Sequence, residues 1–257
     1  MKVVIFAGGK GTRISEESYM RPKPMIEIGG YPILWHIMKI YAAQGINEFV
    51  VCLGYKGYMI KEYFINYFMH HSDMTVDLNN NDLEIHRSNS ENIRVTLADT
   101  GLETLTAGRL KRVQKYVGDS DFMLTYGDGV ANVDVQKLLA YHNKKGKICT
   151  MTAIQSGSRF GIMDLNDQNE VSDFIEKPKD EGTWINGGYF VLKPKVFDYL
   201  HADADSMMWE NQPLEDLAKD GELVAYKHTG FWKCMDTLRD KNDLEKMWQD
   251  EPKWKMW

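Results

Sequence analysis

The sequence predicts an α/β fold in which a mostly parallel sheet is flanked by helices, with small antiparallel additions. In the first half of the chain, short apolar runs alternate with runs of helical spacing, and glycines end several of these runs. Strands that are apolar throughout are buried on both faces, as in parallel sheets covered by helices. In such sheets, ligands gather at the carboxyl ends of the strands.

The elements of the first half follow from these patterns. Apolar runs predict strands at Val3–Ala7, Phe49–Leu53, Ile93–Leu97 and Phe122–Thr125. Helical spacing predicts helices over Ile33–Ala43 and Gly57–Phe68, and part of a third over Leu110–Val117. His36 lies in the apolar helix, so we expect it to pack in the core.

The second half is more mixed. We expect helices at Val135–His142 and Leu238–Met247, a strand at Cys149–Ile154, a surface turn at Asn79–Asp82, and short strands at Gly161–Leu165, Val171–Ile175 and Tyr189–Leu192. With 257 residues, the chain fits one large domain. We expect a first half over about residues 1–130, a second half over about 131–240 and a tail over 241–257. No hexapeptide repeat follows, so a β-helix module is not expected.

Composition excludes several classes of protein. The chain has 31 basic and 37 acidic residues, a net charge of −6, whereas a nucleic-acid-binding protein normally shows a basic surplus. Three cysteines without CxxC spacing, Cys52, Cys149 and Cys234, exclude a disulfide scaffold and a structural zinc site. No apolar run is long enough for a membrane span or a secretory segment. We therefore expect a cytoplasmic protein with neither a nucleic acid nor a membrane as partner.

A glycine-rich turn, Gly8 to Arg13 (GGKGTR), directly follows the first strand. Glycines let backbone N–H groups approach phosphate oxygens closely. A Walker A loop needs Ser or Thr after Gly-Lys, and a dinucleotide fingerprint needs a small residue where Ile14 stands, so neither applies. A flexible turn without a ligand is the alternative, but the cations Lys10 and Arg13 favour an anion site.

Ten residues further on, Lys23 stands between Pro22 and Pro24. Each proline restricts its own backbone and that of the preceding residue, so the position of Lys23 is held rigidly. Such a lysine is suited to contact a phosphate. The alternative is an extended connector with a solvated lysine.

Together these motifs resemble one family. Ala7-Gly8-Gly9-x-Gly11-Thr12-Arg13, Pro22-Lys23-Pro24-Met25, Gly127-Asp128 after an apolar strand, and Glu176-Lys177-Pro178 occur in the order found in sugar-1-phosphate nucleotidylyltransferases. The resemblance covers essentially the whole chain and implies a Rossmann-like fold of the nucleotide-diphospho-sugar transferase type. It also implies that the half over about residues 1–130 binds the nucleotide and that the half over about 131–240 binds the sugar phosphate. The alternatives are an exposed, ion-rich strand end for Glu176-Lys177 and a plain turn for Gly127-Asp128-Gly129.

Further segments are similar to the members of this family that act on CTP and glucose 1-phosphate. They include Glu27–Gly30, Ile33–Met38, Gly54–Tyr58, Gly108–Lys111, Asn186–Gly188 and Gly230–Trp232. The resemblance implies CTP and α-D-glucose 1-phosphate as substrates, CDP-glucose as product, Mg²⁺ as cofactor, and deoxysugar synthesis for the lipopolysaccharide O antigen as context. Gly101-Leu102-Glu103 only faintly matches the Gly-Leu-Ala-Gln element of thymidylyl and uridylyl relatives.

The resemblance also implies residue roles. It places the triphosphate on Ala7, Gly8, Gly9, Gly11, Thr12 and Arg13, the α-phosphate on Lys23, the base on Thr104 and Arg109, the metal on Asp128 (beside Gly127) and Asp236, the sugar on Gly161, Glu176, Asn186 and Gly187, and the sugar phosphate on Lys177. Arg13, Lys23 and Lys177 are the expected catalytic cations. Asp236-Thr237 can also begin a helix as a cap.

Alternatives remain at this point. The same reaction could use another pyrimidine triphosphate or hexose 1-phosphate, and a catalytically silent nucleotide-sugar sensor could share the fold. We also expect a homo-oligomer, because relatives are oligomers and Trp248, Trp254 and Trp257 place aromatic surface on a short tail. The alternative for the tail is that it folds back on its own subunit.

Overall fold

A computed structural model describes residues 1–88, 91–155, 162–165, 171–175 and 184–257. Its strands are β1 (Lys2–Ala7), β2 (Glu27–Ile28), β3 (Tyr31–Pro32), β4 (Glu48–Leu53), β5 (Ser72–Asp77), β6 (Asp82–Ser88), β7 (Arg94–Asp99), β8 (Phe122–Tyr126), β9 (Gly129–Ala131), β10 (Cys149–Gln155), β11 (Ile162–Leu165), β12 (Val171–Ile175), β13 (Trp184–Leu192), β14 (Leu223–His228) and β15 (Trp232–Cys234).

The helices are α1 (Ser15–Ser18), α2 (Ile33–Ala42), α3 (Gly57–His70), α4 (Thr106–Arg112), α5 (Gln114–Val117), α6 (Val135–Lys145), α7 (Gln212–Lys219) and α8 (Leu238–Asp250). Short 3₁₀ turns are η1 (Thr12–Ile14), η2 (Lys23–Met25), η3 (Pro194–Tyr199) and η4 (Ala204–Ser206). No helix in the described part of the chain is both long and apolar enough to cross a bilayer.

Seven strands form the central sheet in the order β14-β10-β13-β8-β1-β4-β7. β1 lies parallel to β4 and β8, β4 to β7, and β10 to β14, whereas β13 runs antiparallel to both β8 and β10. The predicted mostly parallel α/β sheet is therefore confirmed. The carboxyl ends of β1, β4 and β8 meet at one edge, where the Gly8–Arg13 turn and Asp128 follow their strands.

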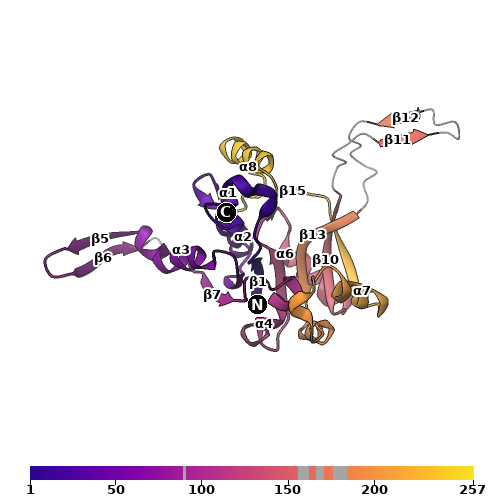
Figure 1. The fold of residues 1–257 in the computed structure, drawn as a ribbon, viewed down its shortest axis with the longest axis horizontal. Coiled ribbons are helices and arrows are strands. Elements are labelled where there is room, and N and C mark those ends of the chain that lie inside the picture. The colour runs from indigo at the N-terminus through magenta and orange to yellow at the C-terminus, as the bar shows by residue number, and fades with distance from the viewer. Residues whose placement is uncertain (89–90, 156–161, 166–170, 176–183) are drawn as a thin grey trace.

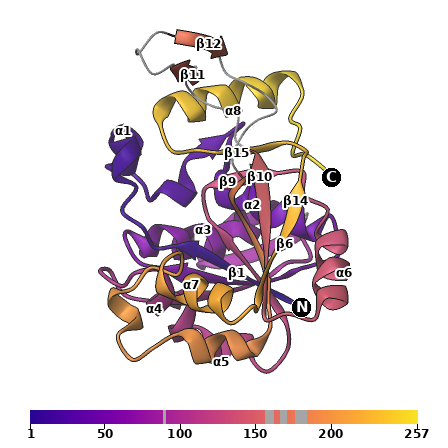
Figure 2. The same ribbon diagram turned by 90° about the vertical axis from the view of Figure 1, so that its right-hand side faces the viewer.

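Apolar side chains cover both faces of this sheet in two layers, and Figure 2 shows helices α6 and α7 on its opposite sides. Side chains alternate between the two faces of a strand, so Val3 and Ile5 of β1 join the layer of α2, α6 and α8, and Val4 and Phe6 join the layer of α4, α5 and α7. Every side chain of β1 after Lys2 is buried, as the uninterrupted apolar run predicts.

Some elements differ from expectation. The helix expected over Leu110–Val117 begins at Thr106 and is interrupted at Val113, giving α4 and α5. The turn expected at Asn79–Asp82 joins two strands, β5 and β6, which form an antiparallel hairpin. This hairpin, residues 72–88, projects away from the body of the molecule beyond α3 (Figure 1) and is called the arm below.

The C-terminal tail corrects an expectation. Trp254 is fully buried and its indole Nε1 donates a hydrogen bond of 3.3 Å to Nδ1 of His36 in α2, while Trp248 and Trp257 pack against the same core. The expectation that these tryptophans form an intersubunit surface is therefore wrong for Trp254, whose ring is buried over α2 of its own chain, whereas Trp248 and Trp257 are only partly buried. Gly29 permits this packing: it has φ 59°, and a Cβ there would collide with Trp248.

Candidate active site

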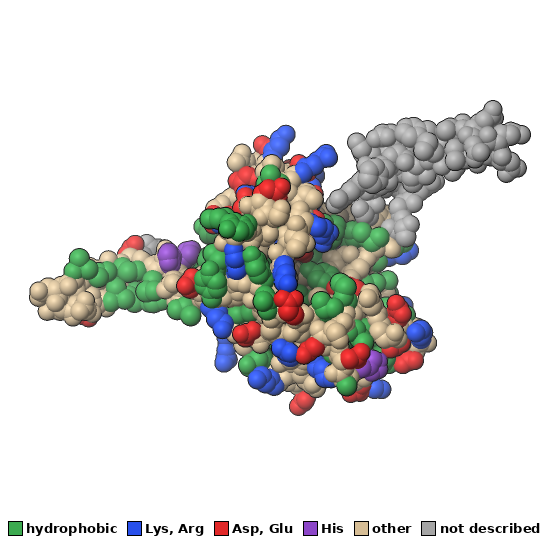
Figure 3. All heavy atoms as spheres, in the orientation of Figure 1, with side chains coloured by type: hydrophobic (Ala, Val, Ile, Leu, Met, Phe, Trp, Pro, Cys, Tyr) green, Lys and Arg blue, Asp and Glu red, His purple; other side chains and the backbone are tan. Residues whose placement is uncertain are grey.

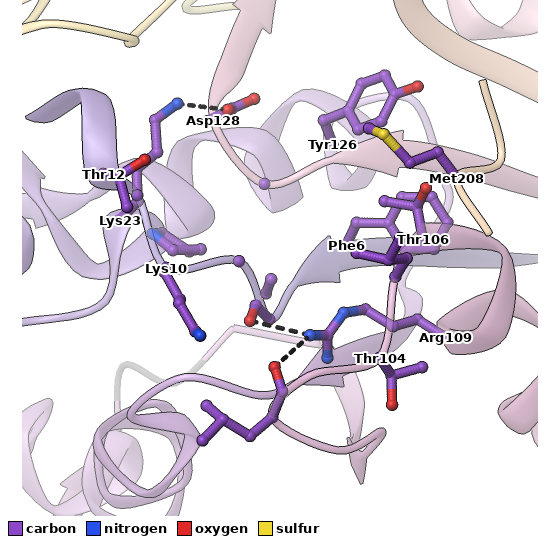
Figure 4. Close-up of a pocket in the computed structure, with 18 of the residues that line it drawn as sticks. Phe6, Lys10, Thr12, Lys23, Thr104, Thr106, Arg109, Tyr126, Asp128 and Met208 are labelled. Atoms are coloured by element: carbon purple, nitrogen blue, oxygen red, sulfur yellow. Dashed lines mark hydrogen bonds and ion pairs between the residues drawn. The ribbon is translucent and has the colours of Figure 1, made fainter. Parts of the chain in front are cut away.

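A cleft of about 540 Å³ opens at the carboxyl ends of β1 and β8. Its lining includes the glycine-rich turn, Lys23, Thr104 and Arg109 of the α4 segment, and Tyr126 to Asp128 after β8. Figure 4 shows Lys23 and Asp128 at one end of the cleft and Thr104 and Arg109 at the other. The volume lies within the range of small-molecule sites, and the sheet edge is the expected one.

The glycine-rich turn is shaped by what lies beneath it. Gly8 has no room for a side chain, because a Cβ there would collide with the Arg109 guanidinium. Gly11 has φ 64°, a conformation that glycine adopts without strain. The predicted nucleotide residues Ala7, Gly8, Gly9, Gly11 and Thr12 all line the cleft.

Lys23 lies in η2, preceded by the extended Pro22 at φ −66° and ψ 146°. Its side chain is only 10% exposed, and its Nζ donates to Oδ2 of Asp128 at 2.6 Å and to Oδ1 of Asp236 at 2.7 Å. Arg13 Nη1 also donates to Asp236, at 2.7 Å. One charged cluster therefore unites Arg13, Lys23, Asp128 and Asp236, of which the first and the last are 223 positions apart in the sequence.

These charges hold one another in their ionised forms. Burial alone would lower the pKa of the Lys23 ammonium, but the charges of Asp128 and Asp236 and their hydrogen bonds outweigh it and raise the pKa above its usual value. Burial likewise opposes ionisation of Asp236, but the hydrogen bond from Lys23 and the charges of Lys23 and Arg13 lower its pKa. Lys23 and Asp236 are therefore both charged at neutral pH.

Asp236 is free for this role because its neighbour caps the following helix. The Thr237 hydroxyl accepts from the backbone N–H of Asp240 at 3.2 Å, and the Asp240 carboxylate accepts from the Thr237 backbone at 3.0 Å, which forms a capping box at the start of α8. The two functions weighed for Asp236-Thr237 are thus divided between the two residues.

Arg109, expected at the base, is almost fully engaged with the backbone. It is 4% exposed, and its terminal nitrogens donate to the carbonyl oxygens of Gly8 (3.1 Å), Leu53 (3.0 Å), Gly101 (2.9 Å) and Leu102 (3.3 Å). It therefore joins the ends of β1 and β4 to the segment before α4. Thr104, 8% exposed, lines the cleft beside it.

The expected sugar residues are only partly described. Asn186 and Gly187 of β13 line a small cavity of about 40 Å³ that shares Tyr126 and Asp128 with the cleft. Asn186 Nδ2 donates to the Tyr126 hydroxyl at 3.2 Å, and Trp232 Nε1 donates to the Gly187 carbonyl at 2.7 Å. Gly161, Glu176 and Lys177 lie outside the described residues.

The structure adds residues that sequence reasoning did not assign. Lys10 Nζ donates to Glu103 at 2.8 Å, joining the glycine-rich turn to the segment before α4 across the cleft. The glycine-rich motif indicates Lys10 as a candidate cation, but no sequence pattern indicates its partner, Glu103. Met208, which precedes α7, also lines the cleft, and no local pattern marks it.

The donor set is suited to a divalent cation such as Mg²⁺. One oxygen of Asp128 and one of Asp236 contact the same ammonium, that of Lys23, so the two carboxylates are close enough to share a cation. Mg²⁺ typically takes one or two carboxylates and completes its shell with phosphate oxygens and water. Among the described residues no group of three or more His, Cys, Asp or Glu side chains forms a metal cluster.

Comparison with known proteins identifies the family. Residues 2–251 match the family described as nucleotidyl transferase. A glucose-1-phosphate cytidylyltransferase of Salmonella typhimurium is 52% identical over 259 aligned positions that cover all of both chains, and that of Salmonella typhi matches equally.

Among solved structures, a UDP-glucose pyrophosphorylase complexed with UDP-glucose superposes with a TM-score of 0.69 at 15% identity, covering 97% of this chain and 98% of the other. This likeness concerns the fold. The match along the sequence and the glycine-rich cleft at the sheet edge lead to one conclusion: the chain belongs to the nucleotidyl transferase family.

Proposed function

We propose that the protein transfers a cytidylyl group from CTP to α-D-glucose 1-phosphate, releasing pyrophosphate and forming CDP-glucose. The observation that carries the proposal is the cluster of Lys23 and Arg13 with Asp128 and Asp236 at the end of a glycine-lined cleft. A full-length identity of 52% to glucose-1-phosphate cytidylyltransferases supports the choice of substrates.

The reaction is an in-line attack of a sugar-phosphate oxygen on the α-phosphorus of CTP. Two polyanions must meet, so the protein's main task is positioning and charge stabilisation. The turn from Gly8 to Arg13 provides backbone N–H groups and a guanidinium for the triphosphate. Lys23 lies at the end of the cleft beside Asp128, and its ammonium would stabilise the negative charge that develops on the α-phosphate.

Asp128 and Asp236 would hold Mg²⁺ together with triphosphate oxygens, and the ion would neutralise charge on the phosphates. Because Lys23 contacts both carboxylates, it would lie next to the ion, with its ammonium available to the α-phosphate. Thr104 and the segment that Arg109 holds in place form the opposite end, which would receive the cytosine.

The direct test is release of pyrophosphate when CTP, Mg²⁺ and glucose 1-phosphate are mixed, compared with UTP and dTTP and with other hexose 1-phosphates. We expect CTP to be preferred by more than about threefold, a difference of at least about 0.7 kcal/mol in the barrier. Equal use of UTP or dTTP would contradict the assignment of the base. Nucleotide-sugar binding without turnover would instead indicate a sensor.

A second test separates the two lysines. We propose that Lys23 serves the nucleotide and Lys177 the sugar phosphate, as the family resemblance implies. A charge-assisted hydrogen bond contributes roughly 1.5–3 kcal/mol, so Lys177→Ala should weaken use of glucose 1-phosphate by about ten- to a hundredfold. Its CTP binding, measured by calorimetry without sugar, should stay near that of the unaltered protein.

Lys23→Ala should lower turnover and weaken CTP as well, and Lys23→Arg should restore little, because a planar guanidinium does not replace a compact ammonium. The division of roles is wrong if Lys177→Ala loses affinity for CTP while its apparent affinity for glucose 1-phosphate is unchanged.

A further inference from the structure

An exposed ion pair connects two walls of the cleft. Lys10, in the glycine-rich turn, donates from its Nζ to both carboxylate oxygens of Glu103, at 2.8 and 2.9 Å. Glu103 belongs to the segment before α4, and both residues line the cleft. In the proposed function the turn receives the triphosphate and the segment before α4 receives the base. The ion pair therefore joins the two parts of the protein between which CTP must lie.

Lys10 differs from the other cations of the cleft in the partner that holds it. In the described part of the chain these are Arg13 and Lys23, which contact partly buried aspartates, and Arg109, which donates to backbone carbonyls. The side chains of Lys10 and Glu103 are 49% and 74% exposed. An ion pair in contact with water contributes little to stability, because both charges stay hydrated when it opens.

A polyanion finds little long-range attraction on this protein. The chain has a net charge of −6, and Figure 3 shows acidic and basic side chains mixed over the face in view, without a broad basic area. The cations inside the cleft must therefore hold the phosphates. Lys10 is suited to this, because it can change its partner without leaving a buried charge unpaired. Figure 4 shows it beside Thr12 and Lys23, on the glycine-rich side of the cleft.

We propose that Lys10 leaves Glu103 when CTP binds and donates to the outer two phosphates, which depart as pyrophosphate. This inference rests on the proposed function, in which Lys23 serves the α-phosphate. Lys23 is nearly buried, whereas Lys10 is half exposed, so the outer phosphates meet the cation from which pyrophosphate can leave into solvent. Glu103 competes with the phosphates: it holds the ammonium before CTP binds and takes it back when pyrophosphate leaves.

The two members of the pair should have opposite effects on CTP binding. If the pair only fixed the shape of the glycine-rich turn, loss of either partner would weaken binding. If Lys10 changes its partner, loss of Lys10 weakens CTP binding, and loss of the Glu103 carboxylate strengthens it. The sign of the change at Glu103 therefore separates an exchange of partners from a structural contact.

The test is calorimetric titration of the full chain with CTP and, separately, with CDP-glucose, at one Mg²⁺ concentration. CDP-glucose retains the α-phosphate of CTP but not the outer two. Lys10→Met should weaken CTP binding by about tenfold, as for loss of a charge-assisted hydrogen bond, and leave CDP-glucose binding unchanged. Glu103→Gln should strengthen CTP binding by about threefold, because only an exposed ion pair has to be broken in the unaltered protein.

Lys137→Met is the matched control. Lys137 is 76% exposed and pairs with Asp134 at 3.0 Å, outside the cleft, so this variant should bind both ligands as the unaltered protein does. A double variant tests the exchange itself. In Lys10→Met, the further change Glu103→Gln should give no gain in CTP affinity, because no ammonium is left to release.

The inference is overturned if Lys10→Met leaves CTP binding unchanged or weakens CDP-glucose as much as CTP. It is also overturned if Glu103→Gln weakens CTP binding, or if its gain persists without Lys10. Pyrophosphate release by the unaltered protein, measured beside these titrations, tests the proposed function separately. Turnover together with an unchanged CTP affinity in Lys10→Met refutes the role of Lys10 alone, whereas absence of both turnover and CTP binding in the unaltered protein refutes both.

Discussion

Acid should destabilise this protein through one histidine that is held in its neutral form. The Nε2 of His36 donates to the carbonyl oxygen of Ile28 at 2.8 Å, and its Nδ1 faces the indole N–H of Trp254 at 3.3 Å. An indole N–H can only donate, so Nδ1 must accept and carries no proton. Protonating it would break the bond to Trp254 and place a charge among aromatic rings.

The size of the effect follows from the pKa. Burial lowers the pKa of His36 from 6.5 to about 4, so the unfolded chain binds this proton at a higher pH than the folded chain does. Stability is therefore complete above about pH 6.5, falls by up to about 1.4 kcal/mol per pH unit on acidification, and levels off below about pH 4. The total, about 3 kcal/mol, is a large part of the usual 5–15 kcal/mol.

The assay is urea unfolding at several pH values between 7 and 4. We expect the unaltered protein to lose stability over this window more steeply than His36→Gln, which has no proton to bind at this position. His86→Gln, the same change at an exposed histidine of the arm, is the control and should keep the steep loss. Identical slopes in the unaltered protein and in His36→Gln would refute the reasoning.

Four further changes probe the site and the core. Gly8→Ala should displace the Arg109 guanidinium, with which its Cβ would collide, and lower turnover with CTP at least tenfold in initial-rate assays. Lys23→Met should let Mn²⁺ bind to the nucleotide-free protein at least tenfold more tightly in electron paramagnetic resonance titrations, because the ammonium that occupies both carboxylates is gone; equal affinities would count against this. Asp128→Asn should abolish metal-dependent turnover with the fold intact by circular dichroism. Combined with Lys23→Met, it should remove the gain in Mn²⁺ affinity. Trp254→Ala should cost about 3–5 kcal/mol in urea unfolding, since the ring is fully buried.

Patterns of burial made the centre of the fold predictable. β1 and β4 are buried on both faces, and their uninterrupted apolar runs indicate this directly. The sequence does not predict the two strands of the arm, although apolar and polar residues alternate over Met74, Thr75 and Val76, because the apolar side chains Val76, Leu83 and Ile85 are exposed rather than buried in the core. The tail shows a related limit: hydrophobicity indicates that Trp254 is buried, but not against which surface.

The residues of the candidate site can be predicted from the sequence where they belong to local motifs, but their long-range contacts cannot. The residues from Gly8 to Arg13 and Lys23 belong to local motifs whose backbone constraints can be read from glycines and prolines. The contact of Lys23 with Asp236 spans 213 positions, and only the fold shows it. The partners of Arg109 are mostly backbone carbonyls, which every residue possesses, so no sequence pattern could have identified them.

The packing of Trp254 against α2 has a consequence for the order in which the chain can fold during synthesis. His36 and its hydrogen-bond partner are separated by 218 positions, so this layer of the core stays open until residue 254 has left the ribosome. Contacts of such long separation form late and slow folding. Until then, the part of α2 that the tail covers stays exposed on the nascent chain, where a chaperone could bind it.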